Sequence, residues 1–251
     1  MTGASTDWDR VAAAYASSPI HAAGPDLVWL VEALKPSPDD RILDLGCGAG
    51  HAGFAVAAVG ALVTAVDTSE RMLETAQLLA GERGLTGFTA LRADVSSLPF
   101  ADATFDGIIS RYSAHHWPDV AVAMREAARV VRPGGRVVVI DTVAPEEPAL
   151  DTLVNALELL RDPTHGRNLR LDEWRAAFEA AGVDQVSERR WPIVLDTRSW
   201  FSRAQTEAWR AEAARALLCA ATPEAVGALA IIDGDQAWSV PAALLAGRRA
   251  A

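Results

Sequence analysis

The chain has little of what marks a secreted, membrane-spanning or nucleic-acid-binding protein. Its two cysteines, Cys47 and Cys219, are too few for a disulfide framework or a zinc site. No apolar run approaches the roughly 18 residues that span a membrane, and the N-terminus lacks the apolar segment of a secretory signal. The formal net charge of −10 argues against a nucleic-acid-binding face. We therefore expect a cytoplasmic protein with neither a membrane nor a nucleic acid as partner.

What the chain does have is a regular alternation of short apolar runs with amphipathic segments. Seven runs have the length of strands: 42–45, 62–66, 88–91, 105–110, 136–141, 184–190 and 237–245. Helical spacing covers 5–17, 25–34, 54–59, 70–83, 119–131 and 171–181. This order is typical of a doubly wound, Rossmann-like α/β fold with helices on both faces of a parallel sheet. Pro241, within the last run, predicts an edge position or a bulge.

Two stretches, 142–170 and 192–232, do not fit this alternation. Both would leave the sheet from carboxyl ends of strands, the edge at which open α/β sheets bind ligands. With residues 1–24 they are expected to form a helical cover over that edge, with Trp8, Trp200 and Trp209 packing it onto the core. The core itself would comprise about 36–141, 171–191 and 235–248, in one domain spanning 1–251.

A glycine-rich turn follows the first expected strand. Gly46, Gly48 and Gly50 come directly after the apolar run and before a helical segment, as in folds that bring backbone close to a ligand. Residues 48–53 formally match the dinucleotide pattern G-x-G-x-x-G, so an NAD-dependent oxidoreductase is one interpretation. Asp44 argues against a pyrophosphate there because like charges repel, and it would suit a cationic or zwitterionic ligand.

Carboxylates also end the next two expected strands. Asp67 is placed to accept hydrogen bonds from a ribose diol. Asp94 is placed to reach an adenine amino group, and the alternative for Asp94 is a cap of a turn. Together with Asp44, these residues favour a nucleoside ligand that carries a positive charge near the glycine turn.

The ordered motifs of residues 40–141 resemble those of class I S-adenosylmethionine-dependent methyltransferases. The resemblance is closest to the small-molecule group similar to ubiquinone/menaquinone-biosynthesis enzymes (type 11). It rests on five motifs: Leu43-Asp44-Leu45-Gly46-Cys47-Gly48-Ala49-Gly50, Val66-Asp67-Thr68-Ser69 with Met72-Leu73, Asp94-Val95 before Leu98-Pro99-Phe100, Phe105-Asp106, and Arg132-Pro133-Gly134-Gly135. It implies a seven-stranded sheet, six strands parallel and the last antiparallel.

The resemblance also implies where S-adenosyl-L-methionine would bind. Its methionine end would lie on the glycine turn, its ribose on Asp67 and its adenine near Met72, Asp94 and Val95. The cofactor-binding residues implied in this way are Tyr15, His21, Asp44, Gly46, Cys47, Gly48, Asp67, Thr68, Met72, Asp94, Val95, Ser110 and Arg111. For Arg111, a pair with the cofactor carboxylate and a surface ion pair are both open, and for Cys47 a packing role is the alternative.

Methyl transfer needs a general base only if the acceptor keeps its proton at neutral pH. His115 and His116 follow the fourth expected strand and are the candidate bases, since a histidine titrates near working pH. His165, Arg167 and Trp117 are expected toward the substrate, and the spacing of the five histidines predicts no metal site. The acceptor is expected to be small and apolar or aromatic, with C- or O-methylation favoured, and the enzyme a monomer or homodimer. The alternative within this fold is a cofactor-binding protein with a regulatory or non-methyl role.

Overall fold

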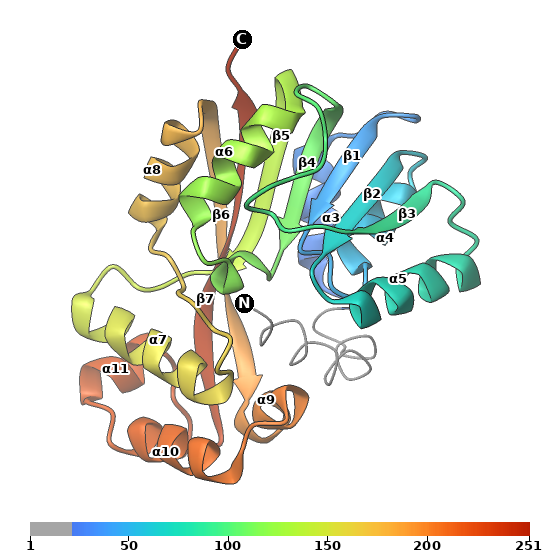
Figure 1. Cartoon of the computed structure of the whole chain (residues 1–251). Helices are drawn as coiled ribbons and strands as arrows, with labels where there is room; N and C mark the ends of the chain where they lie inside the picture. Colours follow the sequence, from blue (N-terminus) through green and yellow to red (C-terminus); the bar gives the residue numbers. More distant parts are fainter. Residues whose placement is uncertain (1–21) are drawn as a thin grey trace.

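A seven-stranded sheet runs through the middle of the protein (Figure 1). The computed structural model describes residues 22–251, so the helix expected over 5–17, and Tyr15 and His21 with it, lie outside the described residues. The strands are β1 (Arg41–Leu45), β2 (Leu62–Asp67), β3 (Phe88–Arg92), β4 (Phe105–Arg111), β5 (Val131–Thr142), β6 (Val183–Asp196) and β7 (Ala237–Arg249). Their order across the sheet is β3-β2-β1-β4-β5-β7-β6.

The directions of the strands are those that the family resemblance implies. β1 pairs in parallel with β2 and β4, and β2–β3 and β4–β5 are parallel as well. β7 is antiparallel to both of its neighbours, β5 and β6. Six parallel strands and an antiparallel last strand confirm the doubly wound fold.

Helices cover both faces of the sheet, because successive strand residues point to opposite sides. Val137 and Val139 of β5 belong to one core, which α6 (Val120–Val130) and α8 (Leu171–Ala180) cover. Val138 and Ile140 belong to the opposite core, covered by α3 (Pro25–Leu34), α4 (His51–Ala57) and α5 (Glu70–Glu82). In β1 the same alternation places the Leu43 side chain in the first core and directs the Asp44 side chain toward α4.

Three strands differ from the sequence-based expectation. β5 begins at Val131 and not at residue 136, because residues 132–135 continue the strand through a register shift against β4. β6 continues to Asp196, paired only with β7. The expectation for Pro241 was wrong, since β7 is an interior strand paired in regular register there. The Pro241 carbonyl accepts a hydrogen bond from the amide of Val143, the residue directly after the end of β5. The amide hydrogen that proline lacks therefore falls at the end of the β5–β7 ladder.

The segments after β5 and β6 form four helices with a hydrophobic core of their own (Figure 1). They are α7 (Pro148–Arg161), α9 (Thr197–Ala204), α10 (Ala208–Cys219) and α11 (Pro223–Ala228). Trp200 of α9 is buried and stacks edge-on against Trp238 of β7, with ring centroids 5.1 Å apart. Trp209 was expected to pack as well, but it is 59% exposed. No helix within residues 22–251 has the length and apolar composition needed to cross a bilayer.

Candidate functional site

The turn after β1 brings backbone and one buried carboxylate together. Gly46 and Gly48 have φ of 63° and 51°, a region that side chains with a Cβ disfavour. A Cβ at Gly46 would overlap the Ser113 hydroxyl, at 1.8 Å, whereas one at Gly48 would meet nothing within 4 Å. The turn is therefore closed by Ser113 on one side and open to a ligand at Gly48.

Asp44 lies beneath this turn with one oxygen paired and the other not. Its Oδ2 accepts a hydrogen bond from the Gly53 amide at 2.9 Å. Its Oδ1 is buried without a hydrogen-bond partner among the described residues. Burial raises the pKa of Asp44 to about 7, although the Gly53 hydrogen bond works in the opposite direction. A buried, partnerless carboxylate oxygen suits a ligand that brings a positive charge.

Asp67, at the end of β2, fixes the shape of the same turn. Its Oδ2 accepts from the Gly48 amide and its Oδ1 from the Ser69 amide, both at 2.9 Å. The Cys47 amide donates to the Val66 carbonyl, and burial raises the pKa of its thiol, so the thiolate is disfavoured. The structure thus gives Cys47 a place in the turn and no reactive character.

The residues expected near the adenine lie at the ends of β2 and β3. Met72 and Val95 are buried, whereas Thr68 and Asp94 are exposed. The Asp94 Oδ1 accepts a hydrogen bond from the Ser96 amide at 2.8 Å, so Asp94 caps the turn, as the alternative interpretation expected. A contact of Asp94 with adenine stays a prediction.

Ser110 and Arg111, at the end of β4, are both buried and bonded inside the protein. The Ser110 hydroxyl donates to the Leu45 carbonyl at 2.9 Å. The Arg111 Nε donates to Asp26 Oδ2 of α3 at 2.5 Å, and the two side chains are 4% and 5% exposed. Of the two alternatives for Arg111, the surface ion pair is therefore wrong, because the ion pair that Arg111 forms is buried. The contact with the cofactor carboxylate stays a prediction. The positive charge of Arg111 also acts on Asp44, lowering the pKa of that carboxyl.

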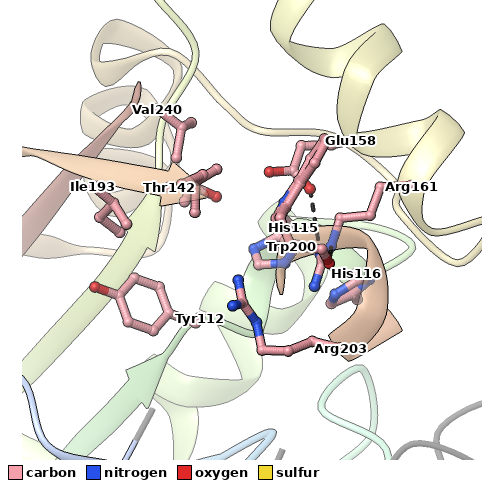
Figure 2. Close-up of a pocket in the computed structure, with 11 residues that line it drawn as sticks. Tyr112, His115, His116, Thr142, Glu158, Arg161, Ile193, Trp200, Arg203 and Val240 are labelled. Carbon is pink, nitrogen blue, oxygen red and sulfur yellow. Dashed lines mark hydrogen bonds and ion pairs between the residues drawn. The ribbon is translucent and has the colours of Figure 1, made fainter. Parts of the chain in front are cut away.

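A pocket opens beyond the ends of β4 and β5, with about 520 Å³ of empty space including its mouth (Figure 2). Its polar and aromatic lining residues are Tyr112, His115, His116, Thr142, Glu158, Arg161, Trp200 and Arg203. Its aliphatic lining residues are Ile193, Leu195 and Val240. The site therefore joins residues from the sheet and from the helices after β5 and β6.

His115 is held in this pocket by Asp141 at the end of β5. Its Nδ1 lies 2.5 Å from Asp141 Oδ1, and its backbone amide donates to Asp141 Oδ2 at 3.0 Å. Burial alone would lower the pKa of His115, but the charge of Asp141 and the hydrogen bond to it together raise that pKa. The ring Nε2 makes no hydrogen bond within residues 22–251, which leaves it for a ligand.

His116 and His165 lie beside His115 but have the opposite electrostatics. The ring centroids of His116 and His165 are 4.2 Å and 5.7 Å from that of His115. Burial, reinforced by the neighbouring His115, lowers the pKa of each to about 3. His116 Nδ1 lies 3.2 Å from the Thr164 carbonyl, and His165 Nε2 lies 3.1 Å from Asn155 Oδ1. Of the three, His115 is the one suited to take up a proton near neutral pH.

The three residues expected toward the substrate lie outside the lining of this pocket. His165 packs behind His115. Trp117 is buried in the core, and its Nε1 donates to the Ser113 hydroxyl at 3.1 Å. Arg167 pairs with Asp151 at 2.7 Å and with Glu173 at 3.3 Å. These three side chains bond to neighbouring parts of the protein and do not form the wall of the pocket.

Sequence reasoning missed most of the pocket. Asp141 could have been found, because it ends an apolar strand just as Asp67 does. Tyr112 carries a signal that only the structure shows. Its φ is 52°, which is costly for an aromatic residue, and strained residues of this kind are frequent at functional sites. Arg161 and Arg203 gave no sequence signal, because only the tertiary fold brings α7 and α9 together. Among the described residues no group of histidine, cysteine or acidic side chains could hold a metal ion.

Comparison with known proteins identifies the family. A family model described as a methyltransferase domain matches residues 43–139. The uncharacterised methyltransferase YcgJ of Bacillus subtilis is 37% identical over 82% of this chain and 81% of its own. The crystal structure of YcgJ covers 90% of this chain and 98% of its own, with a TM-score of 0.86 and 34% identity.

Two further relatives are named for what they methylate. The demethylmenaquinone methyltransferase of Corynebacterium kroppenstedtii is 30% identical over 74% of this chain and 76% of its own. The 27-O-demethylrifamycin SV methyltransferase of Amycolatopsis mediterranei is 35% identical over 59% of this chain and 55% of its own. These matches select methyl transfer over the nicotinamide-dependent alternative. The chain belongs to the S-adenosylmethionine-dependent methyltransferases.

Proposed function

We propose that this enzyme methylates a small, apolar or aromatic molecule on an oxygen or carbon that loses a proton to His115. The observation that carries the proposal is the His115–Asp141 pair in the wall of a partly aliphatic pocket. Two relatives named for demethylmenaquinone and 27-O-demethylrifamycin SV add support, since both names denote small molecules.

The glycine turn fits the cofactor of the family. The buried, partnerless Oδ1 of Asp44 matches a ligand with a positive charge, and the open space at Gly48 allows close approach to backbone. We propose that Asp44 and the turn hold the charged end, that Asp67 holds the ribose, and that Met72, Asp94 and Val95 surround the adenine. When bound, S-adenosylmethionine supplies a methyl group on a sulfonium, with its leaving group already attached.

The protein then has two tasks, to align the acceptor and to remove its proton. Trp200 and the aliphatic wall exclude water from the acceptor, so that positioning supplies much of the rate. His115 accepts the acceptor's proton at Nε2 while Asp141 keeps Nδ1 protonated and stabilises the resulting imidazolium. A base of this kind is needed by a phenol or an activated carbon acid, which keeps its proton at neutral pH. It is not needed by an amine that is already neutral.

Formation of S-adenosylhomocysteine from S-adenosylmethionine with small phenols, enols and amines tests this proposal. We expect turnover with phenols or enols that falls about 100-fold in His115→Ala, because general-base catalysis contributes about that much or more. Turnover confined to amines, and unchanged in His115→Ala, would contradict it. Turnover with none of the three classes would favour the regulatory alternative. The expectations of a cytoplasmic location and of a monomer or homodimer stay predictions.

A further inference from the structure

Asp26 is a buried carboxylate to which the proposed function gives no task. It lies in the first turn of α3, a favourable place for a carboxylate, and its Oδ2 lies 2.5 Å from Arg111 Nε. Burying two charges costs hydration energy that their attraction only partly returns, so such a pair is weak evidence for stability. A buried pair of this kind is better accounted for by what it holds in place.

The register of the sheet places Arg111 beside Asp44. Asp44 of β1 is the partner of Ile109 in β4. Paired residues of neighbouring strands point to the same face, and side chains two residues apart along a strand do so as well. Arg111 therefore lies on the face of Asp44, further toward the carboxyl ends of the strands. The same face carries α3, which brings Asp26 to Arg111.

The ionisation of Asp44 depends on charged groups around it, and Arg111 is the cation among them. Burial raises the pKa of Asp44 to about 7, and the negative charge of Asp67 at the end of β2 raises it as well. The hydrogen bond from the Gly53 amide and the charge of Arg111 lower it. The other titratable side chains of the glycine turn and of α4 are Cys47 and His51. The position of the guanidinium therefore affects the charge at the glycine turn.

Tyr112 encloses Arg111 from a second side. It follows β4 directly, and its φ of 52° takes it out of the strand alternation. Its ring packs against the same core as α3 and stacks on the Arg111 guanidinium, which lies 4.6 Å from the ring centroid. Burial, the charge of Asp26 and a hydrogen bond to Asp26 raise the pKa of Tyr112. Asp26 thus contacts both residues at the end of β4, and Tyr112 continues this cluster into the wall of the pocket (Figure 2).

The Asp26 carboxylate occupies a space that a side chain at Gly24 would fill. A Cβ at Gly24, the residue before α3 begins, would lie 2.0 Å from Asp26 Oδ1 and 3.4 Å from Arg111 Nη2. The chain therefore needs glycine here for the carboxylate and the guanidinium to meet.

We propose that Asp26 is a positioning residue for the cofactor site, which holds the Arg111 guanidinium beside Asp44 and so determines the charge that the cofactor meets at the glycine turn. Asp26 acts through Arg111 and not by a contact with the cofactor. This inference rests on the proposed contact of Asp44 with the cofactor, and it adds to the site a residue from a helix that precedes the sheet.

Two substitutions separate the charge of Asp26 from its hold on Arg111. Asp26→Asn keeps the shape and an oxygen that accepts from Arg111, but removes the negative charge that offsets the guanidinium. The pKa of Asp44, followed by the carbon-13 shift of its carboxyl in the free enzyme, should then fall from about 7 to below about 6.5. Asp26→Ala removes the oxygen as well, so Arg111 is no longer held and the pKa should return to about 7 or above. Asp44→Asn assigns the resonance, and Glu32→Gln, at an exposed position of α3, should titrate as the wild type.

Calorimetric titration of S-adenosylmethionine at pH 6 and pH 8 gives a second measurement. If the cofactor binds the ionised form of Asp44, affinity in the wild type should increase by up to about tenfold between these pH values. In Asp26→Asn the increase should be about fourfold or less, because more of Asp44 is already ionised at pH 6. A residue that served only packing would lower the midpoint of thermal unfolding and leave both quantities unchanged.

The same pKa of Asp44 in the wild type and in Asp26→Asn, or in Asp26→Asn and Asp26→Ala, would overturn the inference. An Asp26→Asn enzyme that does not fold would overturn it as well, since Asp26 would then serve the fold alone. If only Asp26→Ala does not fold, the wild type and Asp26→Asn decide. The carboxyl titration needs no cofactor, so its outcome is independent of the proposed function. An expected response of Asp44, in an enzyme whose affinity for S-adenosylmethionine is equal at both pH values, would refute the contact of Asp44 with the cofactor and retain the role of Asp26.

Discussion

Asp141 holds His115 through both of its carboxylate oxygens, one on the ring Nδ1 at 2.5 Å and the other on the backbone amide at 3.0 Å. The Thr142 amide donates to the same Oδ1 at 2.8 Å, so the carboxylate is itself fixed. Because two points of attachment determine both the place and the rotation of the ring, Nε2 is presented in one direction. The base that we propose is therefore already ordered before each proton transfer.

The first prediction concerns the pH dependence of turnover. The pKa of His115 is raised in the folded protein, and only the neutral imidazole can accept a proton. We therefore expect kcat to rise with pH through a midpoint above the ordinary histidine value of about 6.5. In Asp141→Asn burial persists without the compensating charge, so the midpoint should move to lower pH and the plateau should fall about tenfold or more.

A pH–rate profile of both enzymes measures this shift. Asp184→Asn, which removes an exposed carboxylate on β6, is the control and should retain the wild-type profile. A midpoint that is the same with and without Asp141 would show that His115 is not the titrating group.

The two adjacent histidines should differ when each is replaced. His115→Ala is expected to lower kcat about 100-fold, within the range of general-base catalysis, while the affinity for S-adenosylmethionine changes less than about twofold. His116→Ala should lower kcat less, because a pKa of about 3 makes His116 a weak base at neutral pH. Steady-state kinetics together with calorimetric titration of the cofactor separates the effects. Full activity in both variants would remove the base from the mechanism.

Asp67→Ala should affect the cofactor and the turn together. The substitution removes the proposed ribose contact, so we expect the affinity for S-adenosylmethionine to fall by at least about 100-fold, the lower limit for two hydrogen bonds to a charged group. It also leaves the Gly48 and Ser69 amides without their acceptor, which should lower the free energy of unfolding by about 1–2 kcal/mol. Calorimetric titration measures the first effect and chemical denaturation the second. Unchanged cofactor affinity in a variant that is destabilised would confine Asp67 to a structural role.

Binding of the cofactor should release a proton from Asp44. The pKa of this carboxyl is about 7 in the free protein, so it is largely protonated at pH 6 and ionised at pH 8. A positive charge placed beside its Oδ1 favours the ionised form, which means that affinity should increase as pH rises through about 7.

Titration at pH 6.5 in buffers of different ionisation enthalpy measures the proton released. Asp44→Asn keeps the shape and cannot ionise, so its affinity should be lower and should vary less with pH. A wild-type affinity that is flat between pH 6 and 8 would show that the cofactor's charge does not reach Asp44.

The elements that the sequence predicts well are those set by local pattern. The unbroken apolar run at Val137, Val138 and Val139 predicts a strand buried on both sides. A cap at Thr68 or Ser69 predicts the start of α5, and Ser69 is the residue that caps it. The length of β6 could not be predicted, because its residues past Trp191 are strand only through pairing with β7. The position of Pro241 was misjudged for the same reason: the sequence does not show that β5 ends just where the missing amide hydrogen falls.

The geometry of the glycine turn was more predictable than that of the pocket. Asp44, Asp67 and the glycines lie within a short segment whose geometry follows from one strand, one turn and one helix. The pocket combines Tyr112, Arg161 and Arg203 with strands near the end of the chain, and no local rule connects them. Spacing brought His115 and His116 to attention but could not separate them, since the difference arises from the tertiary contact of His115 with Asp141.

The third hydrophobic core has a consequence for how this enzyme diversifies. All of its residues lie between Val154 and Val240, whereas the methyltransferase-domain match ends at residue 139. Substitutions in α7, α9 and the far ends of β6 and β7 can thus remodel the proposed acceptor pocket without disturbing the packing beneath the glycine turn. Selection can act on the two halves separately. Relatives with different acceptors can inherit one half nearly intact and rebuild the other.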